Sequence, residues 1–363
     1  MNADGGREAI SMKIVVLAGG LSTERAVSLV TGTSVCKALR GNGHQAILVD
    51  LFLGLEEVPE NLETLFDAPD GLCPEAKIEA VEPDLEAIRA SRKDQSERRF
   101  GPNVVEICAL ADIVFLGLHG QDGEDGRIQA AFDLLGIRYT GGGYLASGLA
   151  MDKSMTKRIM DTAGIPNAPW CDIPSYSEED IPALVEKLEV PCAVKVVNGG
   201  SSIGVALPDT KEELEKALHE MLRYGSHIIV EKKIRGRELT VAVLGDRFLP
   251  AVEIVPAIKE FDYAAKYQAG GANELCPAPI TEEQWKTMGN LALKLHRALG
   301  LEVYSRTDFL LDEEGNFWCL EVNSLPGMTS ASLVPKEAAA AGMTYGELCE
   351  EIVQLSYRLK RRG

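Results

Sequence analysis

The feature that most limits how this chain folds is the order of its apolar runs. In about the first 150 residues, strand-like runs (KIVVLA, QAILVDLF and DIVFLGL) alternate with helical stretches, one from about Thr23 to Arg40 and one near Ile128. This alternation is typical of an α/β fold, in which helices cover a parallel sheet. A longer helix, from about Leu145 to Ala163, is followed by the stop signals Gly164 and Pro166. We therefore expect a first α/β domain that ends near this helix.

Beyond Pro191 the pattern changes to closely spaced strands. The runs CAVKVV, HIIVEK, ELTVAVLG and RFLPAVEIV follow one another, and Gly245-Asp246 supplies a turn between the last two. A helix from about Trp285 to Leu299 and a hairpin (VYSRTDFLL, then NFWCLEVN) precede the C-terminal helix. A chain of 363 residues with 45% apolar composition is too long for one domain of ordinary size. The second half is therefore expected to form one or two further domains.

Charge and hydropathy exclude two classes of partner. A formal net charge of -18 repels nucleic acid and anionic membrane surfaces. No run approaches the roughly 18 to 20 apolar residues of a membrane-spanning helix, and the N-terminus lacks the layout of a secretory signal. We predict a soluble, cytoplasmic protein, with residues 1–11 outside its fold.

Two other features are predicted to be structural. Eight cysteines are scattered without a CxxC pair, several of them inside apolar runs, which favours reduced, buried thiols over disulfides or zinc. The stretch from Leu55 to Pro102 is rich in Glu, Asp, Pro and Arg without sustained periodicity. It is predicted to be a solvated insertion.

The hairpin carries the most informative chemistry. Strand alternation sends Arg306 and Asp308 to one face of its first strand. It sends Glu321 and Asn323 to one face of the second strand, and the DEEGN turn places Asp308 opposite Glu321 or one diagonal step away, about 5 to 8 Å. Two carboxylates and an amide suit Mg²⁺ or Mn²⁺, although an exposed hairpin with a solvated polar face has the same pattern. The NSLPGMTSASLVP loop that follows favours a site, because its backbone N–H groups would hold an oxyanion or a carboxylate.

A second candidate site follows the run CAVKVV. Lys195 projects from this strand, and the small-residue loop NGGSSIG comes next. Small residues let backbone amides approach phosphate oxygens, and a lysine supplies charge. A structural hairpin turn would also use glycines, so this signal alone leaves both interpretations open.

Eight ordered blocks of the chain resemble D-alanine:D-alanine ligases. They are AGGLSTERAVSL, LGLHGQDGEDGRIQ, YTGGGYLASGLAMDK, VKVVNGGSSIG, EKKIRGRELTV, DYAAKYQ, RTDFLL and EVNSLPGMTSASLVP. The resemblance implies a three-domain ATP-grasp fold with ATP between the second and third domains. The implied domains are a Rossmann-like N-terminal domain (12–145), a central ATP-grasp subdomain (146–235) and an α+β C-terminal catalytic domain (236–363).

The resemblance also implies contacts to ATP and metal. Lys153 in AMDK and Lys195 would bind the phosphates, and Glu238 the ribose. Without the resemblance, each lysine would be taken for a solvated surface residue. Three residues of the hinge-like EKKI would hold the adenine: Glu231, Lys232 and Ile234. Three residues of the hairpin would hold Mg²⁺ or Mn²⁺: Asp308, Glu321 and Asn323.

Amino-acid contacts follow in the same way. Glu24 in STER would pair with the ammonium of the first D-alanine, although it also suits the first turn of a helix. His119 lies in a loop after a strand, where α/β proteins place ligands. Arg306 and the backbone of Gly327 would stabilise the tetrahedral intermediate. The carboxylate of the second D-alanine would be held by two residues: Ser332 and Leu333.

A covering loop completes the implied site. Lys266 would face the transferred phosphate, and Ser201 would bond to Tyr267. Such a cover is needed because an acyl phosphate hydrolyses unless water is excluded.

The implied reaction makes D-alanyl-D-alanine for peptidoglycan through D-alanyl phosphate, in a homodimer. Val196, Asn198 and Gly142 depart from residues common in the family, which leaves D-serine or D-lactate open as acceptor, although Lys266 and Tyr267 favour D-alanine. Another ATP-grasp ligase or carboxylase remains an alternative, although enzymes of the carboxylase kind lack the HGQDGEDG block that this chain has. A silent nucleotide-binding regulator is a further alternative, and it should have lost a metal ligand.

Overall fold

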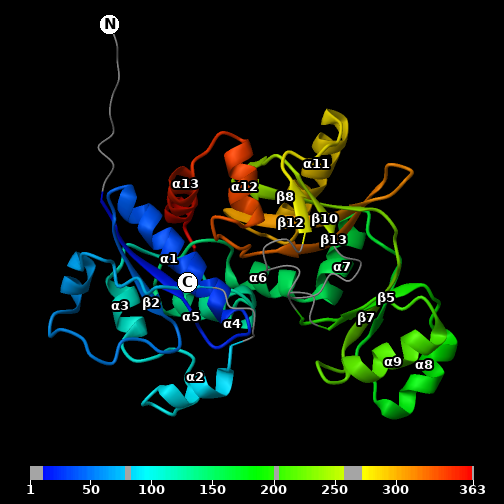
Figure 1. Ribbon diagram of the computed structural model, residues 1–363, viewed down its shortest axis with the longest axis horizontal. Coiled ribbons are helices and arrows are strands. Elements are labelled where there is room, and N and C mark those ends of the chain that lie inside the picture. Colours follow the sequence, from blue (N-terminus) through cyan, green and yellow to red (C-terminus); the bar gives the residue numbers. More distant parts are fainter. Residues whose placement is uncertain (1–10, 78–82, 200–203, 257–271, 362–363) are drawn as a thin grey trace, which may run out of the picture.

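The computed structural model of the chain describes residues 11–77, 83–199, 204–256 and 272–361. These residues form three sheets (Figure 1). The first sheet is parallel, with the order β2-β1-β3, and every residue of β3 and all but the first of β1 are buried. Its strands are β1 (Lys13–Ala18), β2 (Gln45–Asp50) and β3 (Ile113–Leu116). The helices of this part are α1 (Arg25–Gly41), α3 (Val104–Leu110), α4 (Gln121–Glu124) and α5 (Arg127–Leu135). The α/β prediction for this region is confirmed.

The second sheet is antiparallel, in the order β11-β10-β8-β12-β13, with β9 paired to β8. Its strands are β8 (Arg237–Leu244), β9 (Arg247–Phe248), β10 (Val252–Pro256), β11 (Ala272–Leu275), β12 (Tyr304–Leu311) and β13 (Phe317–Asn323). Helix α11 (Glu282–Ala298) packs on β8. The run RFLPAVEIV, predicted as one strand, is divided between β9 and β10, because Pro250 lacks the N–H that a continuous strand needs.

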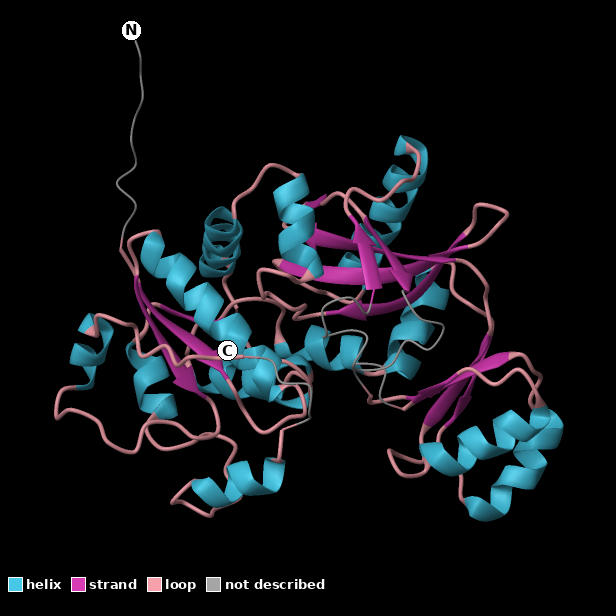
Figure 2. Cartoon of the chain, in the orientation of Figure 1, coloured by secondary structure: helices cyan, strands magenta, loops and turns pink. Residues whose placement is uncertain are grey.

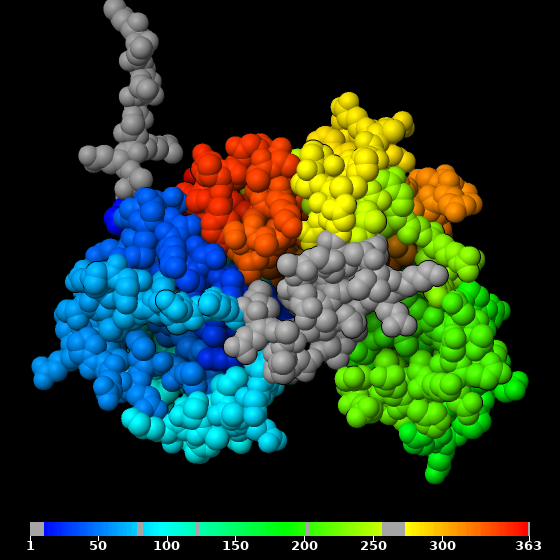
Figure 3. Space-filling model, viewed as in Figure 1, coloured from blue at the N-terminus to red at the C-terminus, as the bar shows by residue number. Residues whose placement is uncertain are grey.

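The third sheet is small and has the order β4-β7-β5-β6, with antiparallel pairing throughout. Its strands are β4 (Trp170–Ile173), β5 (Cys192–Val196), β6 (Val205–Ala206) and β7 (Ile228–Lys232). Three helical segments accompany it: η2 (Glu178–Asp180), α8 (Ile181–Lys187) and α9 (Lys211–Met221). Both longer helices lie on one side of the sheet (Figure 2). This lobe, green in the space-filling view, projects from the rest of the molecule (Figure 3).

The predicted helix from about Leu145 to Ala163 is two helices, α6 (Tyr144–Met151) and α7 (Lys153–Ala163). Asp152 between them is extended, and its side chain accepts a hydrogen bond of 2.8 Å from Met155 N. An aspartate that caps a new helix competes with continuation of the old one. The prediction of one helix was therefore wrong at this residue.

The predicted solvated insertion from Leu55 to Pro102 is also partly wrong. It contains η1 (Leu62–Asp67) and α2 (Leu85–Ser91), and Phe66 is only 2% exposed in the first core. Apolar side chains that are few and irregularly spaced can still pack on a neighbouring sheet, and no periodic pattern announces them.

The last two helices are α12 (Leu333–Ala340), which packs on β8, and α13 (Tyr345–Arg358), which packs against α1 and β3. In Figure 1, α13 lies beside α1, and its buried Leu348 and Ile352 belong to the core of the parallel sheet. His44 Nε2, before β2, lies 2.7 Å from Glu350 Oε2 on α13. The C-terminal segment therefore joins the first part of the chain to the second sheet.

All eight cysteines are free. Five are buried, but Cys171 is exposed, and Cys73 and Cys276 are partly exposed, so the prediction of buried thiols was wrong for these three. In the part of the chain that the structure describes, no helix combines the length and hydropathy needed to cross a membrane.

Candidate active site

The parallel sheet offers a ligand position where its strand order reverses. The chain leaves β1 towards β2 on one side, while β3 pairs on the other, so the loops after β1 and β3 flank a switch point. Glu24 ends the first loop, directly before α1, and is 8% exposed. A Cβ on Gly120 would lie 3.0 Å from Glu24 Oε2, so the Glu24 carboxylate reaches the loop after β3.

His119 in that second loop is buried and held on two sides. Its Nε2 lies 3.0 Å from Thr31 Oγ1 on α1, and its Nδ1 lies 3.8 Å from Glu124 Oε1. Burial raises the pKa of Glu124, the nearby Glu24 charge raises it further, and His119 opposes the shift. Two carboxylates and an imidazole thus gather at one end of the parallel sheet, and Glu124 is a member that the sequence did not single out.

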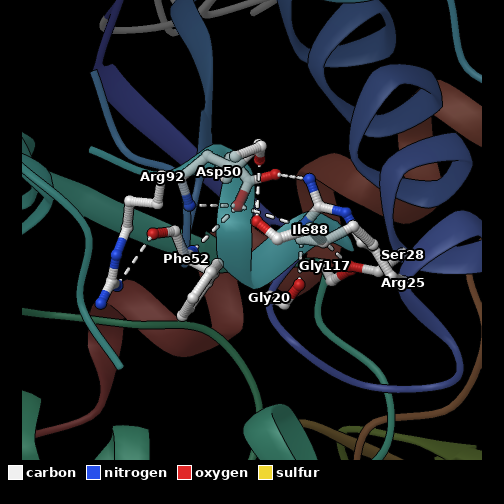
Figure 4. Close-up of polar contacts among 11 residues, drawn as sticks. Gly20, Arg25, Ser28, Asp50, Phe52, Ile88, Arg92 and Gly117 are labelled. Atoms are coloured by element: carbon white, nitrogen blue, oxygen red, sulfur yellow. Dashed lines mark hydrogen bonds and ion pairs between the residues drawn. The ribbon is translucent and has the colours of Figure 1, made fainter. Parts of the chain in front are cut away.

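An ion pair beside Glu24 shapes the first loop (Figure 4). Arg25 binds Asp50, at the end of β2, through both terminal nitrogens, with Nη1 3.2 Å from Oδ1. Ser28 Oγ accepts from Gly19 N at 2.9 Å and donates to Gly117 O at 2.7 Å. These bonds tie the loops after β1 and β3 to α1, which fixes the backbone on either side of Glu24. Sequence reasoning missed this network, because its members come from four separate segments.

The hairpin brings the predicted metal ligands together. Asp308 pairs with Glu321 across β12 and β13, and Arg306 pairs with Asn323, so the predicted register is confirmed. The pairing of Phe309 with Cys319 leaves Leu320 as an extra residue, a β-bulge. Asn323 Nδ2 lies 3.3 Å from Asp308 Oδ2.

Asp308 collects several donors. Arg306 donates two hydrogen bonds of 2.9 Å to its two oxygens, and Thr240 Oγ1 on β8 donates a third at 2.5 Å. Although burial lowers the pKa of Arg306, the charge of Asp308 raises it overall. These three hydrogen bonds hold the Asp308 carboxylate in a fixed orientation. Thr240 was not predicted, because it lies 68 residues from Asp308 in the chain.

These residues fit a magnesium or manganese ion. Hard carboxylate and amide oxygens are the donors that both ions prefer, and magnesium commonly binds few protein groups alongside nucleotide phosphates. Among the described residues, no group of three or more His, Cys, Asp or Glu side chains is placed to hold a metal. The candidate set differs because it has two carboxylates and one amide, which leaves coordination positions for phosphate oxygens.

Two lysines lie near this set, Lys153 on α7 and Lys195 on β5 of the small sheet. Lys153, at the start of α7, donates from its side chain to Gly199 O and from its backbone to Val197 O at 3.2 Å. Burial lowers the pKa of Lys153, the Glu321 charge raises it and the Lys195 charge lowers it. Lys153 and Lys195 therefore form a concentrated positive region next to Glu321, as a polyphosphate site requires.

Glu231 offsets part of that charge. Its Oε2 lies 3.2 Å from Lys195 Nζ, and its Oε1 lies 3.1 Å from Lys157 Nζ. The second pair lacks hydrogen-bond alignment, so it is an ion pair held by charge. Lys157 was missed, although its place four residues after Lys153 on α7 puts it on the same helix face.

The other nucleotide candidates lie between the small sheet and the second sheet. Lys232 is the last residue of β7 and is exposed, and Ile234 lies in the connection that follows. Glu238 lies on β8 and pairs with Ile254 on β10. Adenine and ribose contacts would thus come from the segment that joins the two sheets.

The loop before α12 closes another side. Ser332 Oγ accepts from Thr329 N at 3.1 Å, and a Cβ on Gly327 would lie 3.0 Å from Ser332 Oγ. Leu333 is the first residue of α12. The helix is anchored by Glu337, whose Oε2 accepts from Ala242 N on β8 at 2.6 Å. The predicted acceptor residues are therefore adjacent.

Three predicted residues lie outside the described residues: Ser201, Lys266 and Tyr267. The remaining predicted residues form two groups, one at the parallel sheet and one between the two antiparallel sheets. Glu124 of the first group is near enough to Lys153 of the second for its charge to raise the pKa of that lysine.

This combination of sheets and charged groups defines an ATP-grasp enzyme. Family models described as "D-ala D-ala ligase N-terminus" and "D-ala D-ala ligase C-terminus" match residues 13–142 and 159–354. The chain belongs to the D-alanine–D-alanine ligase family. The resemblance and the ATP-grasp fold predicted from sequence are thus confirmed.

Individual relatives agree with this assignment. The D-alanine–D-alanine ligase of Lacticaseibacillus casei (strain BL23) is 40% identical over 97% of this chain and 98% of its own. That of Pediococcus pentosaceus is 42% identical over 94% of this chain and 97% of its own. The solved structure of the Bacillus anthracis enzyme complexed with ATP is 30% identical, covers 96% of this chain and 97% of its own, and has a TM-score of 0.72.

Proposed function

We propose that this chain joins two D-alanine molecules into D-alanyl-D-alanine with hydrolysis of ATP, as a step in peptidoglycan precursor synthesis. The observation that carries the proposal is that the paired carboxylates of Asp308 and Glu321 lie near the ammonium groups of Lys153 and Lys195. A separate carboxylate, that of Glu24, lies at the loop after β3. The named relatives and the ATP-bound neighbour support the reaction and the nucleotide.

The nucleotide would lie between the small sheet and the second sheet. Lys153 and Lys195 would bind phosphate oxygens, and three residues would contact the adenine: Glu231, Lys232 and Ile234. Glu238 would contact the ribose. Three residues would hold Mg²⁺ or Mn²⁺, which when bound offsets phosphate charge: Asp308, Glu321 and Asn323.

The first D-alanine would bind at the parallel sheet, with its ammonium on the Glu24 carboxylate and His119 beside it. Its carboxylate attacks the γ-phosphorus, the bond to ADP breaks, and D-alanyl phosphate forms. The lysines stabilise the charge that moves to the transferred group and to ADP.

The second D-alanine would place its carboxylate at Ser332 and Leu333. Its amine attacks the acyl carbon, and phosphate leaves as the amine loses a proton. Arg306 and the Gly327 backbone would stabilise the oxyanion that forms in between. We propose that a covering segment completes the site through three residues: Ser201, Lys266 and Tyr267.

The acceptor is tested by phosphate release from ATP and Mg²⁺ with D-alanine, L-alanine, D-serine or D-lactate, with mass identification of the product. Release with D-alanine alone, yielding the dipeptide, is expected. A mixed product with D-serine or D-lactate would move the assignment to a different acceptor. No release with any of them would refute the proposed activity.

We also propose a cellular location, a division into domains and an oligomeric state. The chain would act in the cytoplasm, where ATP is available, and its domains would span 12–145, 146–235 and 236–363.

A homodimer is supported by apolar side chains on the contacting helices α5 and α6, where Leu134, Leu145 and Tyr144 are 89%, 62% and 52% exposed. Sedimentation equilibrium of wild type and Leu134→Lys tests this, because a dimer through this face should dissociate in the variant.

A further inference from the structure

Two cysteine thiols meet in the first part of the chain, apart from the candidate active site. Cys36 lies on α1 and is fully buried, whereas Cys73, shortly after η1, is partly exposed. Cys36 is twelve residues beyond Glu24, which is about 18 Å along a helix. The pair is therefore independent of the proposed catalytic chemistry.

Both sulfur atoms converge on one carbonyl oxygen. The distance to Gly71 O is 3.8 Å from Cys36 Sγ and 3.6 Å from Cys73 Sγ. The two thiols are close enough for each to shift the pKa of the other. Two sulfurs that share one carbonyl oxygen are near enough for rotation of the side chains to bring them to bonding distance.

The turn that carries Cys73 is built to stay in this position. Gly71 O accepts from Leu48 N on β2 at 2.8 Å, and Arg40 Nη2 donates to Pro69 O at 3.0 Å. Gly71 and Leu72 are both left-handed, with φ of +64° and +58°. A left-handed leucine is uncommon, so the bonds to β2 and α1 must stabilise the turn.

The two thiols differ in reactivity. The hydrogen bond from Cys36 lowers the pKa of Cys73, and the charges of Lys37 and Arg40 lower it further. The hydrogen bond to Cys73, together with burial, raises the pKa of Cys36. An accessible, acidified thiol beside a second thiol is the arrangement found at cysteines that oxidise reversibly.

We propose that Cys36 and Cys73 form a reversible disulfide modification site for low-molecular-weight disulfides such as oxidised glutathione. The Cys73 thiolate attacks one sulfur of the reagent and releases one glutathione thiolate. The Cys36 sulfur then attacks the Cys73 sulfur, loses its proton to solvent, and releases the second glutathione. Two protein thiols are oxidised and one glutathione disulfide is reduced.

The test incubates the full chain with oxidised glutathione and maps peptides by mass under non-reducing conditions. A peptide pair linked through Cys36 and Cys73 is expected, reversed by dithiothreitol, with turnover within twofold of the reduced protein. Cys36→Ser should trap glutathione on Cys73, and Cys73→Ser should leave Cys36 unmodified. Cys171→Ser is the matched control, because it removes an exposed thiol and should leave the cross-link unchanged.

Two results would overturn the proposal. One is wild-type protein in which Cys73 carries glutathione without the cross-link. The other is a Cys73 that stays reduced while Cys171 reacts. Because Cys36→Ser places a hydroxyl in the core and destabilises it, alkylation of the wild type by iodoacetamide gives an independent check. Cys73 should react faster than Cys171 at neutral pH, and an equal or slower rate would count against the assigned order of attack.

Discussion

Lys157→Met tests whether the buried lysine balances Glu231. The side chains of Lys157 and Glu231 are 1% and 2% exposed, and their charged atoms are 3.1 Å apart. Removing one partner of a buried ion pair costs about 3 to 5 kcal/mol when the remaining charge is left alone. Lys195 Nζ stays 3.2 Å from Glu231, so we expect about half of that, about 2 kcal/mol, in the free energy of unfolding.

The same substitution should weaken ATP binding. Once methionine replaces Lys157, Glu231 attracts Lys195 alone. The side chains of Glu231 and Lys195, both proposed to contact the nucleotide, should therefore shift together. We expect the KM for ATP to rise about tenfold, which corresponds to a loss of about 1.4 kcal/mol in the free energy of ATP binding. The KM for D-alanine should stay within twofold, because Glu24 and Ser332 lie on other elements.

The assay combines denaturant unfolding with steady-state kinetics for Lys157→Met, Glu231→Gln and the double variant. Because the double variant leaves no unbalanced carboxylate, it should be more stable than the sum of the single losses. Additive losses would refute the coupling. A raised KM for D-alanine with an unchanged KM for ATP would refute the assigned location of the nucleotide.

Three other changes test separate parts of the structure. Burial lowers the pKa of His296 to about 4, so its share of stability is complete above about pH 6.5 and is lost as pH falls towards 4. His296→Gln should therefore flatten that part of a plot of melting temperature against pH; an unchanged slope would contradict the cause. Glu321→Gln should abolish turnover while the melting temperature changes little, and retained turnover would exclude Glu321 as a metal ligand. Thr240→Val removes a hydrogen bond to Asp308, so kcat should fall severalfold with a loss of about 1 to 2 kcal/mol in stability, measured by kinetics and unfolding; an unaffected kcat would show that Thr240 does not orient Asp308.

Local signals explain the successful predictions. The apolar runs of β1 and β3 are continuous because both faces of a parallel sheet are covered, and this pattern is visible without any tertiary information. The polar hairpin residues were found because alternation along a strand groups Arg306 with Asp308. The ordered family blocks predicted the ATP-grasp fold, which the comparisons confirm.

The incorrect predictions have local causes too. Asp152 stops α6 by capping α7, a competition between two helix ends that hydrophobic periodicity does not reveal. Phe66 packs into the first core from a segment whose composition is that of a solvated loop. In both cases a single side chain outweighs the average character of its surroundings.

The sequence by itself determined the classes of element, the family and most of the candidate ligands, because these depend on periodicity and on local motifs. The tertiary structure alone decided which charges meet. Glu231 lies between Lys195 and Lys157 because β7 pairs with β5, which carries Lys195, and because Lys157 on α7 reaches the same carboxylate. Thr240 reaches Asp308 because β8 pairs with β12.

The β-bulge is the clearest case of this division. Phe317 and Cys319 point into the core, whereas beyond Leu320 it is Val322 that does so. Without the extra residue, alternation would turn Glu321 towards the core and away from Asp308. One inserted residue, invisible to period-two pattern analysis, therefore puts both carboxylates on the same face of the sheet.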